Sequence, residues 1–213
     1  QACMYPENYH YSLGETRELL DAVVSRYKTR YQAEITPEEV MAVYGSQEGM
    51  AHIFLPLLNP GDLVLLPDPG YPIFATGAFL AQAQQWNYPL TEQNHYLPDF
   101  DAIPEEIRKA AKIMVVSYPA NPICKTAPDS FYEELIAFAR ENEILIIHDN
   151  AYSDIIFDGR VGKSFLSFPG AKEVGVEFYS LSKSYNYTGA RMSFVVGKKE
   201  IITLFKRFRS QID

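Results

Sequence analysis

One lysine, Lys183, lies in a stretch whose residue types could hold a phosphate beside a reactive amine. Ser180 and Ser182 come three residues and one residue before it, and Gly189 and Arg191 follow six and eight residues after it. An arginine can contact a phosphate through two hydrogen bonds at once. An isolated stretch of this kind is more often a polar turn with an exposed lysine. The full pattern nevertheless indicates a binding site for a phosphorylated cofactor.

Two turns earlier in the chain contain groups that suit a phosphate and a flat ring. The apolar segment 40–44 leads into a turn, Gly45-Ser46-Gln47-Glu48-Gly49, and a helix; this order presents free backbone N–H groups to an anion. A later apolar segment, 63–66, ends in a proline-rich turn that presents Tyr71 for aromatic stacking. The structural alternatives are a plain strand-to-helix turn and a packed core tyrosine.

A carboxylate and an amide follow two other expected strands. The apolar segment 144–147 runs into His148 and Asp149, and a carboxylate at the end of a buried strand is costly without a cationic partner. A protonated ring nitrogen would be such a partner, whereas the structural alternative for Asp149 is a helix N-cap. We interpret His148 as structural. Asn121 follows segment 112–118 in an Asn-Pro turn. Because Asn-Pro is a common turn signal, only the position of Asn121 after a strand makes it a candidate site residue.

Strands and helices must alternate to position these turns. The pattern predicts an α/β fold, a three-layer α/β/α domain with a mostly parallel central sheet, in which ligands gather at the carboxyl ends of the strands. We divide the chain into an irregular N-terminal arm, residues 1–13, and one cofactor-binding domain, residues 14–213. Strands are expected at 40–44, 63–66, 86–90, 112–118, 144–147, 176–179 and 192–197, and helices at 14–31, 50–58, 72–85, 101–111, 131–140 and from 199 onward, with an aperiodic connector at 157–174.

Together these motifs resemble those of the fold-type I pyridoxal-phosphate enzymes, in the branch of the class I and II aminotransferases that includes LL-diaminopimelate and alanine aminotransferase-like proteins. The resemblance covers essentially all of the chain and implies the large domain of such an enzyme. In this family the lysine holds pyridoxal 5'-phosphate as an aldimine, the aspartate keeps the ring nitrogen protonated, and the tyrosine stacks on the ring. The catalytic residues that it implies are Lys183, Asp149 and Tyr71.

The resemblance also implies the other contacts to the cofactor. Residues of the first turn, the two serines and the arginine would hold the phosphate, an asparagine and a second tyrosine would reach the 3-oxygen, and a tyrosine of the arm would come from a partner subunit. These residues are Ser46, Gln47, Asn121, Tyr152, Ser180, Ser182, Arg191 and, from the partner, Tyr11. The chain departs from the family's Asn-Pro-Thr-Gly turn, because Ile123 and Cys124 follow Pro122.

The expected reaction is transfer of an amino group from an amino acid to a 2-oxo acid, carried out by a homodimer. A pyridoxal-phosphate β-lyase would use the same lysine and aspartate, and a cofactor-sensing domain of a regulator is an alternative of another class. The family continues into a smaller C-terminal domain with an arginine for the substrate carboxylate, and we expect that domain to lie outside this chain. Arg191 is assigned to the phosphate, and the cluster Lys206, Arg207 and Arg209 is expected on a surface helix.

Composition limits the partners. With a net charge of -8 and a pI near 5.1, the 213-residue chain is a poor match for nucleic acid or an anionic membrane surface. No segment approaches the roughly 18 consecutive apolar residues of a membrane span. Cys3 and Cys124 lie far apart, without the spacing of metal ligands. We therefore expect no metal site and a reducing, cytoplasmic location.

Overall fold

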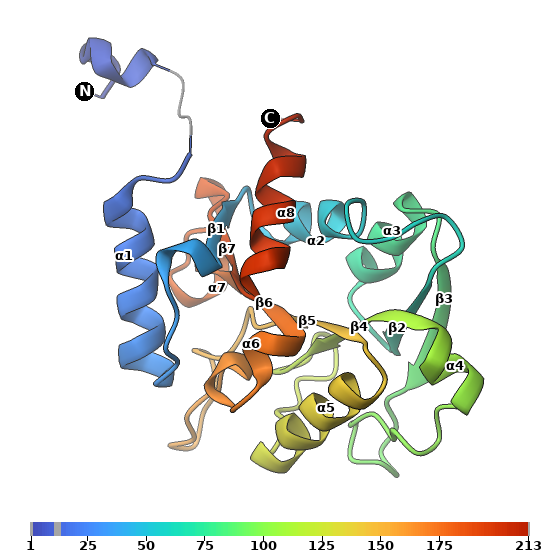
Figure 1. Ribbon diagram of the computed structural model, residues 1–213. Coiled ribbons are helices and arrows are strands. Elements are labelled where there is room, and N and C mark those ends of the chain that lie inside the picture. The colour runs from blue at the N-terminus through green and yellow to red at the C-terminus, as the bar shows by residue number, and fades with distance from the viewer. Residues whose placement is uncertain (1, 11–13, 213) are drawn as a thin grey trace.

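The computed structural model describes residues 2–10 and 14–212, and a seven-stranded sheet forms its centre (Figure 1). The strands are β1 (Val40–Val43), β2 (Leu63–Asp68), β3 (Gln84–Pro89), β4 (Ala111–Ser117), β5 (Leu145–Asp149), β6 (Gly175–Ser180) and β7 (Ser193–Gly197). They lie in the order β1-β7-β6-β5-β4-β2-β3. Neighbours pair in parallel except β7, which is antiparallel to both β6 and β1. The predicted α/β fold with a mostly parallel sheet is confirmed.

The helices differ in extent from the sequence prediction: α1, α3 and α4 are shorter, α5 is longer at both ends, and α2 begins within the turn that was expected to precede it. The α-helices are α1 (Arg17–Arg26), α2 (Ser46–Ile53), α3 (Pro72–Leu80), α4 (Glu105–Ala110), α5 (Asp129–Glu141), α6 (Ala171–Val174), α7 (Leu181–Ser184) and α8 (Lys199–Arg209). Shorter helical turns are η1 (Ala2–Met4), η2 (Pro6–Tyr9), η3 (Tyr27–Tyr31), η4 (Pro37–Glu39), η5 (Phe165–Ser167) and η6 (Thr188–Ala190). The expected connector 157–174 thus contains η5 and α6. In the described ranges, no helix combines the length and apolar character needed to cross a bilayer.

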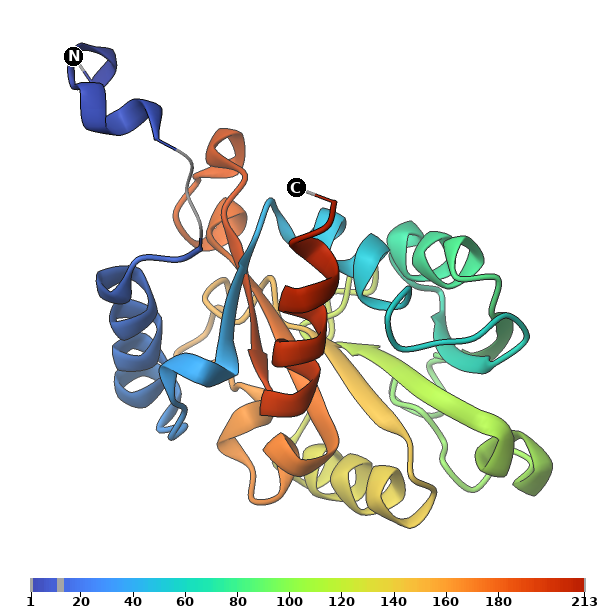
Figure 2. The same cartoon turned by 45° about the horizontal axis from the view of Figure 1, so that its top comes forward.

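Each face of the sheet is covered by its own layer of helices. Successive residues of a strand point to opposite faces, so on β4 Met114 and Val116 belong to one apolar core while Ile113 and Val115 belong to the other. Residues of α1, α5 and α6 complete the first core, and residues of α2, α3 and α8 complete the second. Figures 1 and 2 show the sheet between these two layers.

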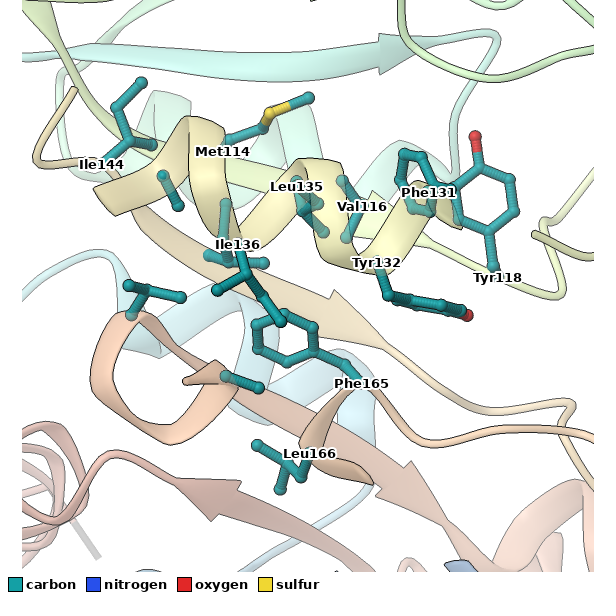
Figure 3. Packing of buried hydrophobic residues seen from close by; sticks show 14 of the residues in the cluster. Met114, Val116, Tyr118, Phe131, Tyr132, Leu135, Ile136, Ile144, Phe165 and Leu166 are labelled. Carbon is teal, nitrogen blue, oxygen red and sulfur yellow. The ribbon is translucent and has the colours of Figure 1, made fainter. Parts of the chain in front are cut away.

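Helix α5 shows how a covering helix packs on the first face. Phe131 and Leu135 lie four residues apart, on one face of the helix, and are buried with Tyr132 and Ile136. In Figure 3 these side chains lie among residues of β4 and Phe165. Leu135 is fully buried, and burial of such a side chain stabilises the fold by about 1.5–3 kcal/mol.

A buried polar cluster ties η3 to the sheet on the same face. Glu177 of β6 is fully buried and accepts hydrogen bonds from the Tyr27 hydroxyl, the Ser164 hydroxyl and the Phe165 amide at 2.8–2.9 Å. Oε2, which accepts the Phe165 amide, also lies 2.9 Å from Nδ1 of His148. Since a buried carboxylate is stable only when its oxygens are hydrogen-bonded, this set of donors explains why Glu177 is tolerated in the core. His148 therefore lies in a structural cluster, as the sequence interpretation expected.

The free edge of β1 is covered by side chains. The amide of Ala42 donates to Oε1 of Glu15 at 2.7 Å, and its carbonyl accepts from Nη1 of Arg209 at 3.0 Å. Arg209 is only 6% exposed, so its expected place on the helix surface was wrong. It follows Ile202 and Phe205 at helical spacing and shares the buried face of α8, whereas Arg207 is exposed.

Candidate active site

The residues predicted from the sequence gather at one edge of the sheet. The parallel strands β1, β2, β4, β5 and β6 end at this edge, and the antiparallel β7 begins there. Ser46 and Gln47 follow β1, Tyr71 follows β2, Asn121 follows β4, Asp149 ends β5 with Tyr152 just beyond it, Ser180 ends β6 with Ser182 and Lys183 just beyond it, and Arg191 precedes β7. Tyr11 lies outside the described residues.

Lys183 sits in α7, the short helix that follows β6. The hydroxyl of Ser180 accepts the Ser182 amide at 3.2 Å and lies 3.0 Å from the Ser193 hydroxyl, which fixes the start of this helix against β7. Ser180 is buried, while Lys183 is exposed. The Lys183 amine lies 5.9 Å from the centre of the Tyr152 ring. The turn thus directs the exposed Lys183 amine toward Tyr152, just beyond the end of β5.

Tyr152 lies among the other predicted side chains. Its hydroxyl accepts a long hydrogen bond from Nδ2 of Asn121 at 3.5 Å. Burial raises the pKa of Tyr152, and the nearby Asp149 and Tyr71 raise it further. Tyr71 in turn donates to Oε1 of Gln47 at 3.2 Å. Hydrogen bonds therefore connect the turns after β1 and β2 and the turns after β4 and β5, and the electrostatic effect of Tyr71 on Tyr152 links the two pairs.

Asp149 is a buried carboxylate with unused hydrogen-bonding capacity. It is 8% exposed, and its Oδ1 makes no hydrogen bond to the part of the chain that the structure describes. Burial raises its pKa to about 6, although His148 and a hydrogen bond from the Ala151 backbone act in the opposite direction. Residues 151–154 form a bend and a turn, so no helix begins just after Asp149 for it to cap. The site therefore offers an acceptor to a cationic N–H donor.

The protein without bound ligands is expected to gain stability when Asp149 is replaced with asparagine. The folded pKa of about 6 exceeds the ordinary value of 3.8, so between these pH values the folded state binds more protons and loses stability as pH rises. At pH 7 the variant should be more stable by up to about 3 kcal/mol, at about 1.4 kcal/mol per pH unit. Urea unfolding at about pH 4 and pH 7 measures this, and equal stability of the two proteins at pH 7 would contradict it.

Arg191 and the turn after β1 form a second part of the site. Gly45 has a φ of 91°, and a Cβ placed there would lie 2.2 Å from Nη2 of Arg191. The guanidinium is oriented by a 3.0 Å hydrogen bond from Nη1 to the Thr188 carbonyl. Ser46 and Gln47 are the first residues of α2, where amide groups lack partners within the helix. A cation packed on a helix N-terminus suits an anion such as a phosphate.

The unusual turn after Asn121 keeps a closed geometry. Cys124 has a φ of 60°, in the left-handed region where the resembled family has glycine. Its amide donates to the Ala120 carbonyl at 2.6 Å, and the Ala120 amide donates to the Lys125 carbonyl at 2.9 Å. The substitution is therefore accommodated without opening the turn, and the thiol is exposed near Tyr152.

One group that the sequence interpretation missed links α1 to the Lys183 turn. Asp154 accepts hydrogen bonds from Arg26, from Nε of Arg30 at 3.1 Å and from the Tyr179 hydroxyl at 2.9 Å. Arg26 also donates to the Tyr185 hydroxyl at 2.8 Å. Arg26 and Arg30 are four residues apart, a spacing that places both on one helix face and is the only sign of this cluster in the sequence.

Known protein families and proteins match this chain over most of its length. A family model described as aminotransferase class I and II matches residues 8–212. The LL-diaminopimelate aminotransferase of Halothermothrix orenii is 46% identical over 92% of the chain and 51% of its own length. That of Moorella thermoacetica is 43% identical over 98% of the chain and 54% of its own length. The chain thus spans about half the length of the curated relatives it matches.

Solved structures show the same arrangement of strands and helices. The substrate-bound BacF of Bacillus subtilis superposes with a TM-score of 0.96, at 39% identity, over 99% of this chain and 54% of BacF. A probable N-succinyldiaminopimelate aminotransferase from Thermus thermophilus gives a TM-score of 0.93 at 38% identity, over all of this chain and 57% of that protein. Because the family match extends over nearly the whole sequence, the chain belongs to the pyridoxal-phosphate-dependent class I and II aminotransferases.

Proposed function

We propose that the chain forms the cofactor-binding part of an aminotransferase that moves an amino group from an amino acid to a 2-oxo acid. The observation that carries this proposal is the meeting, at one sheet edge, of the Lys183 amine, the Asp149 carboxylate and the cation of Arg191. Pyridoxal 5'-phosphate needs a partner for its aldehyde, its ring N–H and its phosphate. Two observations fit the last two needs: within the described residues Oδ1 of Asp149 has no hydrogen-bond partner, and the Arg191 guanidinium packs against Gly45 at the start of α2.

The bound cofactor would supply an aldehyde for the amino group and a ring that accepts electrons when the substrate Cα proton leaves. Lys183 would hold the cofactor through its Nζ and, once released as a free amine, move the proton to and from Cα. Asp149 would keep the ring nitrogen protonated, because its ionised form is stabilised by that N–H. Tyr71 would stack on the ring.

The remaining side chains would orient the cofactor. Asn121 and Tyr152 are already within hydrogen-bond reach of each other and would share the ring oxygen. The amides at the start of α2 and the Arg191 guanidinium would hold the phosphate from two sides. The residues that would contact the phosphate, through side chains or backbone amides, are Ser46, Gln47, Ser180, Ser182 and Arg191.

A panel of amino donors tests the reaction class. The complete protein, loaded with cofactor, is assayed with 2-oxoglutarate or pyruvate as acceptor, and the relatives' names place LL-diaminopimelate among the donors to include. Acceptor-dependent formation of a new amino acid supports the proposal. Release of ammonia without an acceptor would instead identify a lyase, and tight cofactor binding without turnover of any donor would identify a sensing domain.

We also propose a homodimer in a reducing, cytoplasmic environment. Tyr44, Tyr185 and Tyr187 are exposed aromatic residues close to the candidate site, a distribution that suits a subunit interface. Cys3 and Cys124 are both free thiols, which suits a reducing compartment. Light scattering on the complete protein measures the oligomeric state, and a monomer at micromolar concentration would contradict the dimer.

Replacing Gly45 with alanine is expected to weaken cofactor binding by at least about tenfold, the effect of losing one hydrogen bond to a charged group. The new Cβ would displace the guanidinium of Arg191 from the α2 turn. Gly61→Ala is the matched control, because Gly61 has nearly the same φ, 89°, but no atom within 4 Å of the new Cβ. Both variants carry similar backbone strain. Equilibrium titration measures the affinity of each variant for the cofactor, and equal affinities of Gly45→Ala and Gly61→Ala would contradict the role of Arg191.

A further inference from the structure

A salt bridge behind the α2 turn connects it to the last helix. Glu48, the third residue of α2, accepts the Tyr44 amide through Oε2 at 3.0 Å. Its Oε1 lies 2.7 Å from Nδ1 of His52 and 3.2 Å from Nε of Arg209. The carboxylate therefore bridges the end of β1, the body of α2 and helix α8.

Arg209 contacts both sides of Gly45. Before the glycine, its Nη1 donates to the Ala42 carbonyl at 3.0 Å, and its guanidinium carbon lies 5.0 Å from the centre of the Tyr44 ring. After the glycine, it meets Glu48. The Arg209 side chain is only 7% exposed, so these contacts are shielded from water and weakly screened.

We propose that Arg209 and Glu48 are a positioning pair that holds the turn Gly45-Ser46-Gln47 in the geometry needed to bind a phosphate. The pair fixes the backbone on either side of Gly45, so the first amides of α2 and the guanidinium of Arg191 stay directed at one point. This inference rests on the proposed function, in which that point is occupied by the cofactor phosphate. It assigns a role to two residues that are not among the proposed cofactor contacts.

A purely structural role for the pair makes a different prediction. If Arg209 only fastens α8 to the sheet, its loss would lower the stability of the fold without changing the preference for a phosphorylated ligand. If the pair positions the turn, its loss would weaken the phosphate contacts and spare contacts to the ring. The ratio between the affinities for pyridoxal and pyridoxal 5'-phosphate separates the two cases, because these molecules differ only in the phosphate group.

The sign of the effect for Glu48 gives a second discrimination. Glu48→Gln removes a negative charge close to the phosphate site, and charge alone would then strengthen binding of an anion. Positioning predicts the opposite, because an amide holds Arg209 less firmly than a carboxylate does. A weaker affinity for the phosphorylated ligand in this variant therefore cannot come from net charge.

The experiment measures dissociation constants of both ligands for the complete protein and the variants Arg209→Met and Glu48→Gln. Arg207→Met is the matched control, since Arg207 is exposed on the same helix and its loss changes the net charge equally. We expect the constant for pyridoxal 5'-phosphate to rise about tenfold in both test variants, as for one lost charged hydrogen bond. The constant for pyridoxal and both constants of the control should stay within about twofold.

Each outcome separates the positioning role from a purely structural role of the pair or from an error in the proposed phosphate site. An unchanged affinity ratio in both Arg209→Met and Glu48→Gln overturns the positioning role, and tighter phosphate binding in Glu48→Gln does the same. If the unmodified protein binds pyridoxal as tightly as pyridoxal 5'-phosphate, the proposed phosphate-binding site is wrong. Both the proposed function and this inference are then contradicted. Should Arg209→Met fail to fold, Glu48→Gln alone still decides.

Discussion

Replacing Lys183 with alanine is expected to abolish covalent retention of the cofactor and to slow amino transfer by at least about 10²–10⁴-fold, the range for loss of a general acid–base group. The reason is that the Lys183 amine both binds the cofactor and transfers the proton, and no other predicted site residue carries an amine. Borohydride reduction of the loaded protein followed by peptide mapping should place the pyridoxyl mass on Lys183. In the alanine variant the cofactor should be removed by dialysis.

Lys109→Ala provides the control for the lysine experiment. Lys109 is exposed on α4, where it pairs with Glu105, and is not among the predicted site residues. This variant should retain the cofactor and its full rate. A pyridoxyl mass on Lys109, or on any lysine other than Lys183, would contradict the assignment of Lys183 as the residue that binds the cofactor covalently.

Replacing Asp149 is expected to leave the cofactor attached to Lys183 but to slow exchange of the substrate Cα proton by about 10²-fold or more, in the range of a missing electrostatic contribution of a few kcal/mol. Without the carboxylate the ring nitrogen loses its proton, and the ring then accepts electrons poorly. Exchange is followed by NMR as loss of the Cα proton signal of an amino acid in deuterated water.

A comparison of two substitutions shows which property of Asp149 matters. Its side chain accepts a hydrogen bond from the Ala151 backbone, and asparagine can keep that bond while alanine cannot. If Asp149 only shapes the turn, Asp149→Asn should exchange protons at the rate of the unmodified protein and Asp149→Ala should not. If the negative charge is required, both variants should be slow.

Most of the candidate site was predictable because the relevant residues follow short apolar strands. A parallel sheet brings the carboxyl ends of its strands to one edge, so the positions of Ser46, Tyr71, Asn121, Asp149 and Lys183 followed from strand order along the chain. The sequence did not need to specify which strands are neighbours, because any parallel arrangement gives this result.

The parts that escaped prediction depend on contacts between distant segments. Arg209 was assigned to the surface because a charged residue in an amphipathic helix usually is solvated, and its partner Glu48 lies far away in the sequence. Asp154 was overlooked for the same reason, since its partners Arg26 and Arg30 lie 128 and 124 residues away in the sequence. Helix ends were also misplaced: α3 stops at Leu80 because β3 already begins at Gln84, a limit set by the sheet.

The pairing of β1 with β7 has a consequence for the order in which the protein can fold. Val40 pairs with Val196, so β1 can pair with β7 only after nearly all of this chain has been synthesised. The strands β2 to β6 can assemble earlier, because each has a partner nearer in sequence. Contacts of such long range slow folding. The turn that follows β1 should therefore be among the last regions to form, and nascent chains should acquire affinity for phosphate only after the rest of the sheet has assembled.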